Sequence, residues 1–116
     1  MAFPAHFVVA ARCRKRWRGH NFDAAAAEGN VGAALAAALG VPARTTADLE
    51  AFLRRVFVRA YGEGLDPNPA APFDPEVGER FEFHVGLRDP ADAARAKEME
   101  DVARRAVAAS RNFALA

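Results

Sequence analysis

Hydrophobic and polar residues alternate strictly along residues 80–87, RFEFHVGL. The apolar positions are Phe81, Phe83, Val85 and Leu87. This period of two predicts a half-buried strand, because successive side chains of a strand point to opposite faces. Residues 6–13, HFVVAARC, alternate less strictly and also fit the start of a helix, but their Phe and Val favour a strand. One strand makes no sheet, so we expect 80–87 to pair with 6–13 or with another chain.

A helical period of hydrophobic residues runs through residues 46–61, TADLEAFLRRVFVRAY. The apolar stripe consists of Leu49, Phe52, Leu53, Val56, Phe57 and Ala60. Thr45 and Asp48 stand at the spacing of a capping box just before it. The spacing predicts one amphipathic helix over 46–61, with Phe52 and Val56 in the core and Arg55 in solvent or against a partner.

Two further regions have helical signals. Asp23 and Asn30 are placed to cap short helices over 24–28 and 31–39, and the glycines between them predict two pieces or one kinked helix. Asp89 and Pro90 have the types preferred at the first positions of a helix, which predicts a C-terminal helix over 89–111.

Four prolines between Pro67 and Pro75 forbid helix and sheet interior, so we expect a proline-rich extended arm over 65–78. Phe73 is a candidate anchor within it. Together the patterns predict a single domain over 1–116. Its fold class is α+β and helix-dominated, with three to four helices and one short strand pair.

Charge is unevenly distributed in the 116-residue chain, whose net charge is only +1. Residues 1–22 form a basic N-terminal segment without any acid. Its cations surround Trp17 and are Arg12, Arg14, Lys15, Arg16 and Arg18. We expect this segment, with Trp17 as anchor, to bind an acidic protein surface or a nucleic-acid backbone. The low net charge argues against a general polyanion-binding domain.

Cys13 is the single cysteine, so no intrachain disulfide can form and a reducing intracellular compartment is expected. No apolar run approaches the length of a membrane span. The Arg-rich, Ala-rich and acid-poor start is similar to an organellar presequence. We therefore expect the mitochondrial matrix or another organelle if this segment is an import signal, and the cytoplasm if it is not.

Common catalytic motifs are absent from the sequence: there is no P-loop, GxGxxG, CxxC or HExxH. We therefore assign no catalytic residue and expect no cofactor. The three histidines, His6, His20 and His84, have the number needed for an open zinc site, but their spacing matches no local metal motif. We expect no metal, with a three-histidine zinc site as the alternative.

The stretches CRKRWRGHNF, TTADLEAFL and FEFHVGL resemble the 6-pyruvoyl-tetrahydropterin synthase family. Its members carry a Cys, a His-x-His-Asn element, a Thr-led helix and a late strand. The resemblance implies a zinc-dependent enzyme. Arg18 stands where the family has the first histidine of the pair, which leaves the implied zinc site one ligand short.

The function predicted from these observations is that of a non-enzymatic accessory or assembly subunit of a larger intracellular complex. The absence of a catalytic constellation, an alanine-rich core and the proline-rich arm support it. An RNA-contacting subunit is the first alternative, and a zinc-dependent enzyme similar to the pterin synthases is the second.

Overall fold

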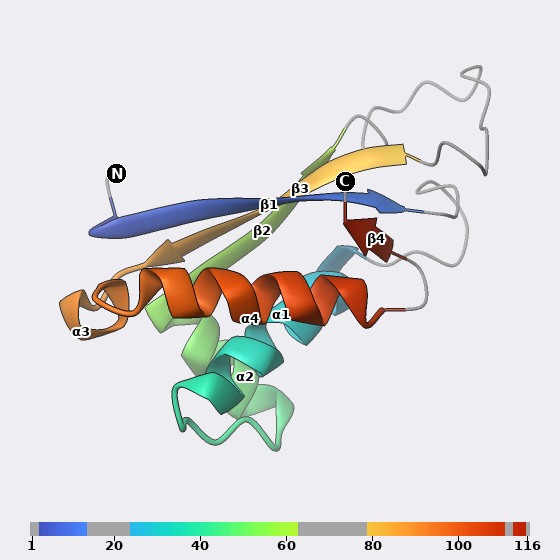
Figure 1. Ribbon diagram of the computed structural model, residues 1–116. Helices are drawn as coiled ribbons and strands as arrows, with labels where there is room; N and C mark the ends of the chain where they lie inside the picture. The colour runs from blue at the N-terminus through green and yellow to red at the C-terminus, as the bar shows by residue number, and fades with distance from the viewer. Residues whose placement is uncertain (1–2, 14–23, 63–78, 111–112, 116) are drawn as a thin grey trace.

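The computed structural model describes residues 3–13, 24–62, 79–110 and 113–115 (Figure 1). Its elements are, in chain order, β1 (Ala5–Cys13), α1 (Ala24–Ala38), α2 (Thr46–Arg55), β2 (Val56–Gly62), β3 (Glu79–Leu87), α3 (Pro90–Ala93), α4 (Ala96–Ala108) and β4 (Phe113–Leu115). None of the described helices is both long and apolar enough to cross a membrane.

The strands form one four-stranded antiparallel sheet in the order β2-β3-β1-β4. The central strands β1 and β3 pair from Ala5 opposite Leu87 to Cys13 opposite Glu79. The helices lie on one side of this sheet, with α4 against β1 and α1 against β2 (Figure 1). The order and the alternation of elements match a ferredoxin-like, split β-α-β arrangement. Such a fold hosts many unrelated functions, so function must be argued from side chains.

The core lies between the sheet and the helices. In β3 the residues predicted to be apolar and buried, Phe81, Phe83, Val85 and Leu87, are all buried. They meet alternate residues of β1 and one face of α4: Phe7, Val9, Ala11, Met99, Ala103 and Val107. The strand pair predicted over 6–13 and 80–87 is therefore confirmed as an intrachain pair.

The predicted proportion of helix to strand is wrong. A helix-dominated domain with one short strand pair was expected, and the structure has four strands. The expected helix over 46–61 ends at Arg55, and the chain continues as strand β2. Phe52 and Val56 are buried as expected, but Val56 belongs to a strand. In β2 the buried residues are Val56, Val58 and Ala60, a period of two.

The predicted N-terminal caps at Thr45 and Asp89 are present, but the predicted helix lengths differ from those in the structure. The side chain of Thr45 accepts a hydrogen bond from the backbone of Asp48 (3.1 Å), and that of Asp89 accepts one from Ala91 (2.8 Å). The helix expected over 89–111 is divided into α3 and α4 near Arg95. Over 24–39, where two pieces or one kinked helix were expected, the structure has one helix, α1. Gly32 allows this helix to approach α2, since a Cβ there would lie 2.9 Å from Leu53 Cδ2.

Glu28 protects the edge of the sheet. The carboxylate of this α1 residue accepts a hydrogen bond from the backbone N–H of Ala60 (2.9 Å), which lies in the edge strand β2. Ala60 is buried, so without Glu28 this N–H would lose its partner away from water. We expect Glu28→Ala to lower the unfolding free energy by about 1–3 kcal/mol, measured by urea unfolding.

Glu28→Gln is the matched control for this prediction. Its amide oxygen can still accept the Ala60 hydrogen bond, so we expect a smaller loss of stability. Equal losses for the two variants would show that the charge of Glu28, and not its hydrogen bond to the strand, is what stabilises the fold.

Candidate functional site

The face of the sheet opposite the helices is the candidate site, and we call it the open face. It carries the residues that alternate with the buried ones along the three longer strands: His6, Val8, Ala10, Arg12, Phe57, Arg59, Tyr61, Arg80, Glu82, His84 and Gly86. The helices do not cover these positions (Figure 1).

Two arginines that have no ion-pair partner among the described residues mark one end of the open face. The register of β1 and β3 places Arg12 directly opposite Arg80. Like charges at opposite positions of an antiparallel pair are destabilising. The Nε atom of Arg12 is also buried, and it has no hydrogen-bond partner in the described part of the chain. Within the described residues, no acid forms an ion pair with Arg12, Arg59 or Arg80. This end of the face therefore has unused capacity to bind an anion.

A ring cluster centred on His84 lies next to these arginines. Its Nδ1 is 3.3 Å from Nε2 of His6, and its Nε2 is 3.1 Å from a carboxylate oxygen of Glu82. Tyr61 meets the His84 ring edge-on, with ring centroids 5.0 Å apart. Tyr61 is 47% exposed although it is a large ring, so the cluster is open to a ligand.

The opposite end of the open face is apolar. The ring of Phe3 lies over Gly86, where a Cβ would come within 2.7 Å of that ring. The same ring is 5.5 Å from the ring of Phe57, between centroids. The Arg88 guanidinium stands 5.6 Å from the Phe3 ring centroid and donates to the backbone oxygen of Arg54 (2.9 Å). The lack of a side chain at Gly86 thus makes room for Phe3.

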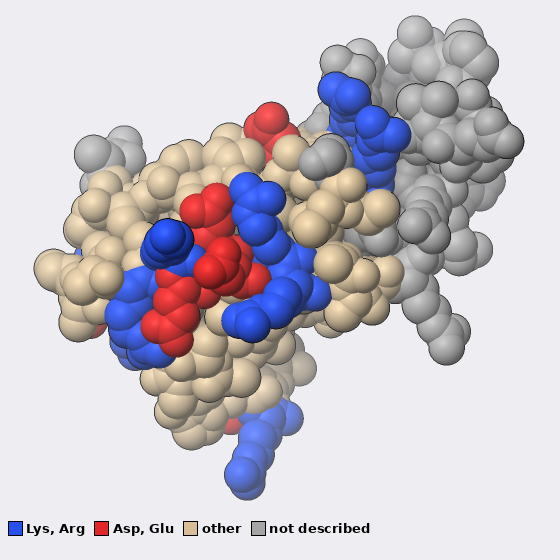
Figure 2. Space-filling model, viewed as in Figure 1, with Lys and Arg blue, Asp and Glu red and all other residues tan. Residues whose placement is uncertain are grey.

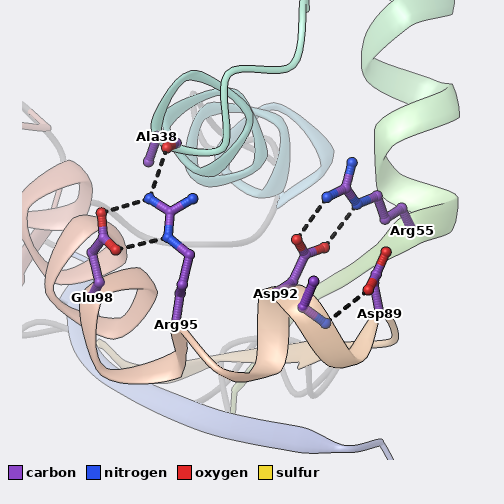
Figure 3. Close-up of polar contacts among 7 residues, drawn as sticks. Ala38, Arg55, Asp89, Asp92, Arg95 and Glu98 are labelled. Carbon is purple, nitrogen blue, oxygen red and sulfur yellow. Dashed lines mark hydrogen bonds and ion pairs between the residues drawn. The ribbon is translucent and has the colours of Figure 1, made fainter.

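Charges on the helical side are arranged differently. Figure 2 shows basic and acidic side chains interleaved over α4. Arg104 pairs with Glu100 (3.2 Å), and Arg95 pairs with Glu98 (2.7 Å) and also donates to the oxygen of Ala38 (Figure 3). The hydrogen bond between Arg95 and Glu98 raises the pKa of the arginine and lowers that of the carboxyl. Such mixed, mutually paired charges are typical of a solvated helix surface.

Arg55 and Asp92 form the one ion pair of the described residues that has a buried member. Arg55 donates two hydrogen bonds to the Asp92 carboxylate, of 2.7 Å and 2.6 Å (Figure 3). Asp92 is 2% exposed, whereas the Arg55 side chain is 40% exposed. The hydrogen bond to Asp92 raises the pKa of Arg55. The pair joins α2 to α3 and has a structural role.

Most of the partner-binding residues predicted from the sequence lie outside the described residues. Only Arg12 is described, on the open face. The others, which lie in the basic N-terminal segment and the proline-rich arm, are Arg14, Lys15, Arg16, Trp17, Arg18 and Phe73. Their segments join the sheet at Cys13, Gly62 and Glu79, which the strand register places at the same end as Arg12 and Arg80.

The histidines of the alternative zinc site are partly brought together. His6 and His84 are neighbours on the open face, and His20 lies outside the described residues. In the described part of the chain, no three His, Cys, Asp or Glu side chains are grouped so as to hold a metal ion. The three-histidine site therefore stays an untested alternative.

Sequence reasoning missed Arg59, Tyr61 and Arg80 as members of the site. The first two were assigned to a helix, which would not place them beside His84. A signal was present in VFVRAYG, where every second residue is apolar and small or β-branched. The sequence places Arg80 on the polar side of its strand, but only the register of β1 and β3 shows that it lies opposite Arg12.

Searches against protein-family models, curated proteins and solved structures return no match for this chain. The resemblance to the pterin synthases stays a prediction. The functional argument depends on the open face and its side chains.

Proposed function

We propose that this protein is a non-enzymatic accessory subunit of a larger complex and that it binds an anionic partner on its open face. The opposed arginines Arg12 and Arg80 are the observation that carries the proposal. They repel each other, and one buried N–H of Arg12 has no hydrogen-bond partner among the residues that the structure describes. An anionic group between them would relieve both costs, because phosphate and carboxylate oxygens accept charge-assisted hydrogen bonds from guanidinium groups.

Single-stranded RNA is the anionic partner that suits the open face best. The rings of Tyr61, His84 and His6 lie one, two and three side-chain rows away from the opposed arginines. Single-stranded RNA is bound by such combinations, with bases stacked on rings and phosphates held by cations. An acidic protein surface would pair with the arginines, but it has no bases to stack on the exposed rings beside them.

A second copy of the same face is a poorer partner. Arg12, Arg59 and Arg80 face a single acid, Glu82, on the open face. Packing two such faces together would bring cations against cations, which is unfavourable unless anions screen them. The basic N-terminal segment continues from the end of β1 that carries Arg12, so its cations add to the charge available to an RNA backbone.

The proposal predicts a specific loss of RNA binding when the opposed arginines are removed. We expect Arg12→Gln/Arg80→Gln to weaken binding of a short single-stranded RNA by about tenfold or more, measured by fluorescence anisotropy across a salt series. The slope of log K against log salt should fall by about 1.4, because each lost phosphate contact to a single strand contributes about 0.7. Thermal stability should be unchanged or raised, since the repulsion is removed.

Arg104→Gln/Arg105→Gln is the matched control, because it removes the same charge from the exposed side of α4. We expect its RNA affinity to stay within about twofold of the wild type at equal salt. Equal weakening in both double variants would show that only net charge matters and would contradict the proposal. Binding to polyglutamate but not to RNA would show that the partner is an acidic protein.

A further inference from the structure

The open face holds two imidazole nitrogens within hydrogen-bond distance of each other. Nδ1 of His84 and Nε2 of His6 lie 3.3 Å apart, on the adjacent central strands β3 and β1. His6 is exposed, and the His84 side chain is 27% exposed. A small ion in water can therefore reach the space between the two nitrogens.

Glu82 determines which nitrogen of His84 is available. Its carboxylate oxygen is 3.1 Å from Nε2 of His84. An ionised carboxylate only accepts hydrogen bonds, so Nε2 carries the proton in the contact. In the neutral ring the lone pair is then on Nδ1, the atom that faces His6. Glu82 thus orients an imidazole lone pair toward a second imidazole.

We propose that His6 and His84 form a two-histidine site for a divalent transition-metal ion, with Glu82 as the carboxylate that orients His84. Two nitrogens bound to a tetrahedral ion at about 2.0–2.1 Å are separated by about 3.3–3.4 Å, so the rings already stand at the required spacing. A metal-bound histidine that donates its other N–H to a carboxylate is the usual arrangement around such ions. The site uses His6 and His84, which also lie on the surface proposed to bind RNA, so its test is made without RNA.

The ligand set defines the metals and the strength of binding. Imidazole nitrogens suit Zn²⁺, Ni²⁺ and Cu²⁺, whereas Mg²⁺ and Ca²⁺ require oxygen ligands. Only two protein ligands are present in the described residues, so water fills the other positions and the ion exchanges readily. Arg59 stands opposite His84 and adds a repulsion that Glu82 offsets.

The test is isothermal titration calorimetry of the full chain with Zn²⁺ and, separately, with Ni²⁺, in the absence of RNA. We expect one ion per chain, and no binding of Mg²⁺. His6→Ala and His84→Ala should each weaken binding by at least about tenfold, and Glu82→Gln by about tenfold. His20→Ala is the matched control and should bind as the wild type does.

Unchanged affinity in His6→Ala or His84→Ala would overturn the proposal, as would a loss in His20→Ala as large as theirs. A second readout needs no variant: paramagnetic Ni²⁺ should broaden the ring-proton NMR signals of two histidines, His6 and His84, before that of His20. Broadening of His20 first, or of all three together, would also overturn it. Because RNA is absent, neither result bears on the RNA proposal.

Discussion

Phe83→Ala is expected to lower the unfolding free energy by about 3–5 kcal/mol. The Phe83 side chain is 0% exposed and lies in β3, a central strand of the sheet. It packs edge-to-face on Phe81, with ring centroids 5.0 Å apart, within the core beneath the helices. Natural domains are stable by only about 5–15 kcal/mol, so the variant should be largely or partly unfolded at physiological temperature. Urea unfolding followed by circular dichroism measures the change.

Phe57→Ala is the matched control for this prediction. Phe57 lies in the edge strand β2 on the open face and is only partly buried, against Phe3. Its loss removes less buried area and leaves no enclosed cavity, so we expect a cost of about 1 kcal/mol. Equal costs at the two positions would contradict the location of the core between the sheet and the helices.

Arg55→Met is expected to cost more stability than Asp92→Ala, although both variants remove the same ion pair. Without Arg55, the Asp92 carboxylate is left buried and unpaired, because it is only 2% exposed. Breaking a buried pair in this way costs about 3–5 kcal/mol. Without Asp92, the Arg55 guanidinium can be hydrated, since its side chain is already 40% exposed. We expect Asp92→Ala to cost about 1–2 kcal/mol.

Urea unfolding at neutral pH measures both variants, with Arg55→Lys as the conservative control. Lysine keeps the charge but cannot donate in the two-pronged geometry of a guanidinium, so its cost should be intermediate. The pKa of Arg55 is raised by its hydrogen bond to Asp92. A raised pKa means that the contribution of Arg55 is complete below its ordinary pKa, so it does not vary around neutral pH. A larger cost for Asp92→Ala than for Arg55→Met would contradict the burial argument.

The strand at 80–87 could be predicted because its alternation is compatible with one period only. Residues 6–13 also fit the start of a helix, and only their Phe and Val favoured a strand. Residues 56–62 could not be predicted as a strand, because Val56 and Ala60 satisfy two periods at once. They continue the helical stripe that begins at Leu49, and they also alternate with Val58 on one face of a strand. Tertiary contact with β3 resolves the ambiguity, and the helix ends at Arg55. Strand β4 escaped prediction because three residues are too few to show a period.

The candidate site could be predicted only in part, because it depends on strand register. The sequence identified Arg12, His6 and His84, but not which of them are neighbours. The strands β1 and β3 are distant in sequence and no tight turn joins them, so their register is set by packing of the buried faces. That register is what places Arg12 opposite Arg80 and His6 beside His84.

The most direct test of the proposed function is an NMR titration of the isotope-labelled full chain with short single-stranded RNA. The proposal predicts that the Nε–H signals of Arg12 and Arg80 and the ring signals of Tyr61 and His84 shift together and saturate. Signals from the exposed side of α4, including Arg104, should stay in place. Shifts confined to the α4 side, or none on the open face at saturating RNA, would contradict the proposal.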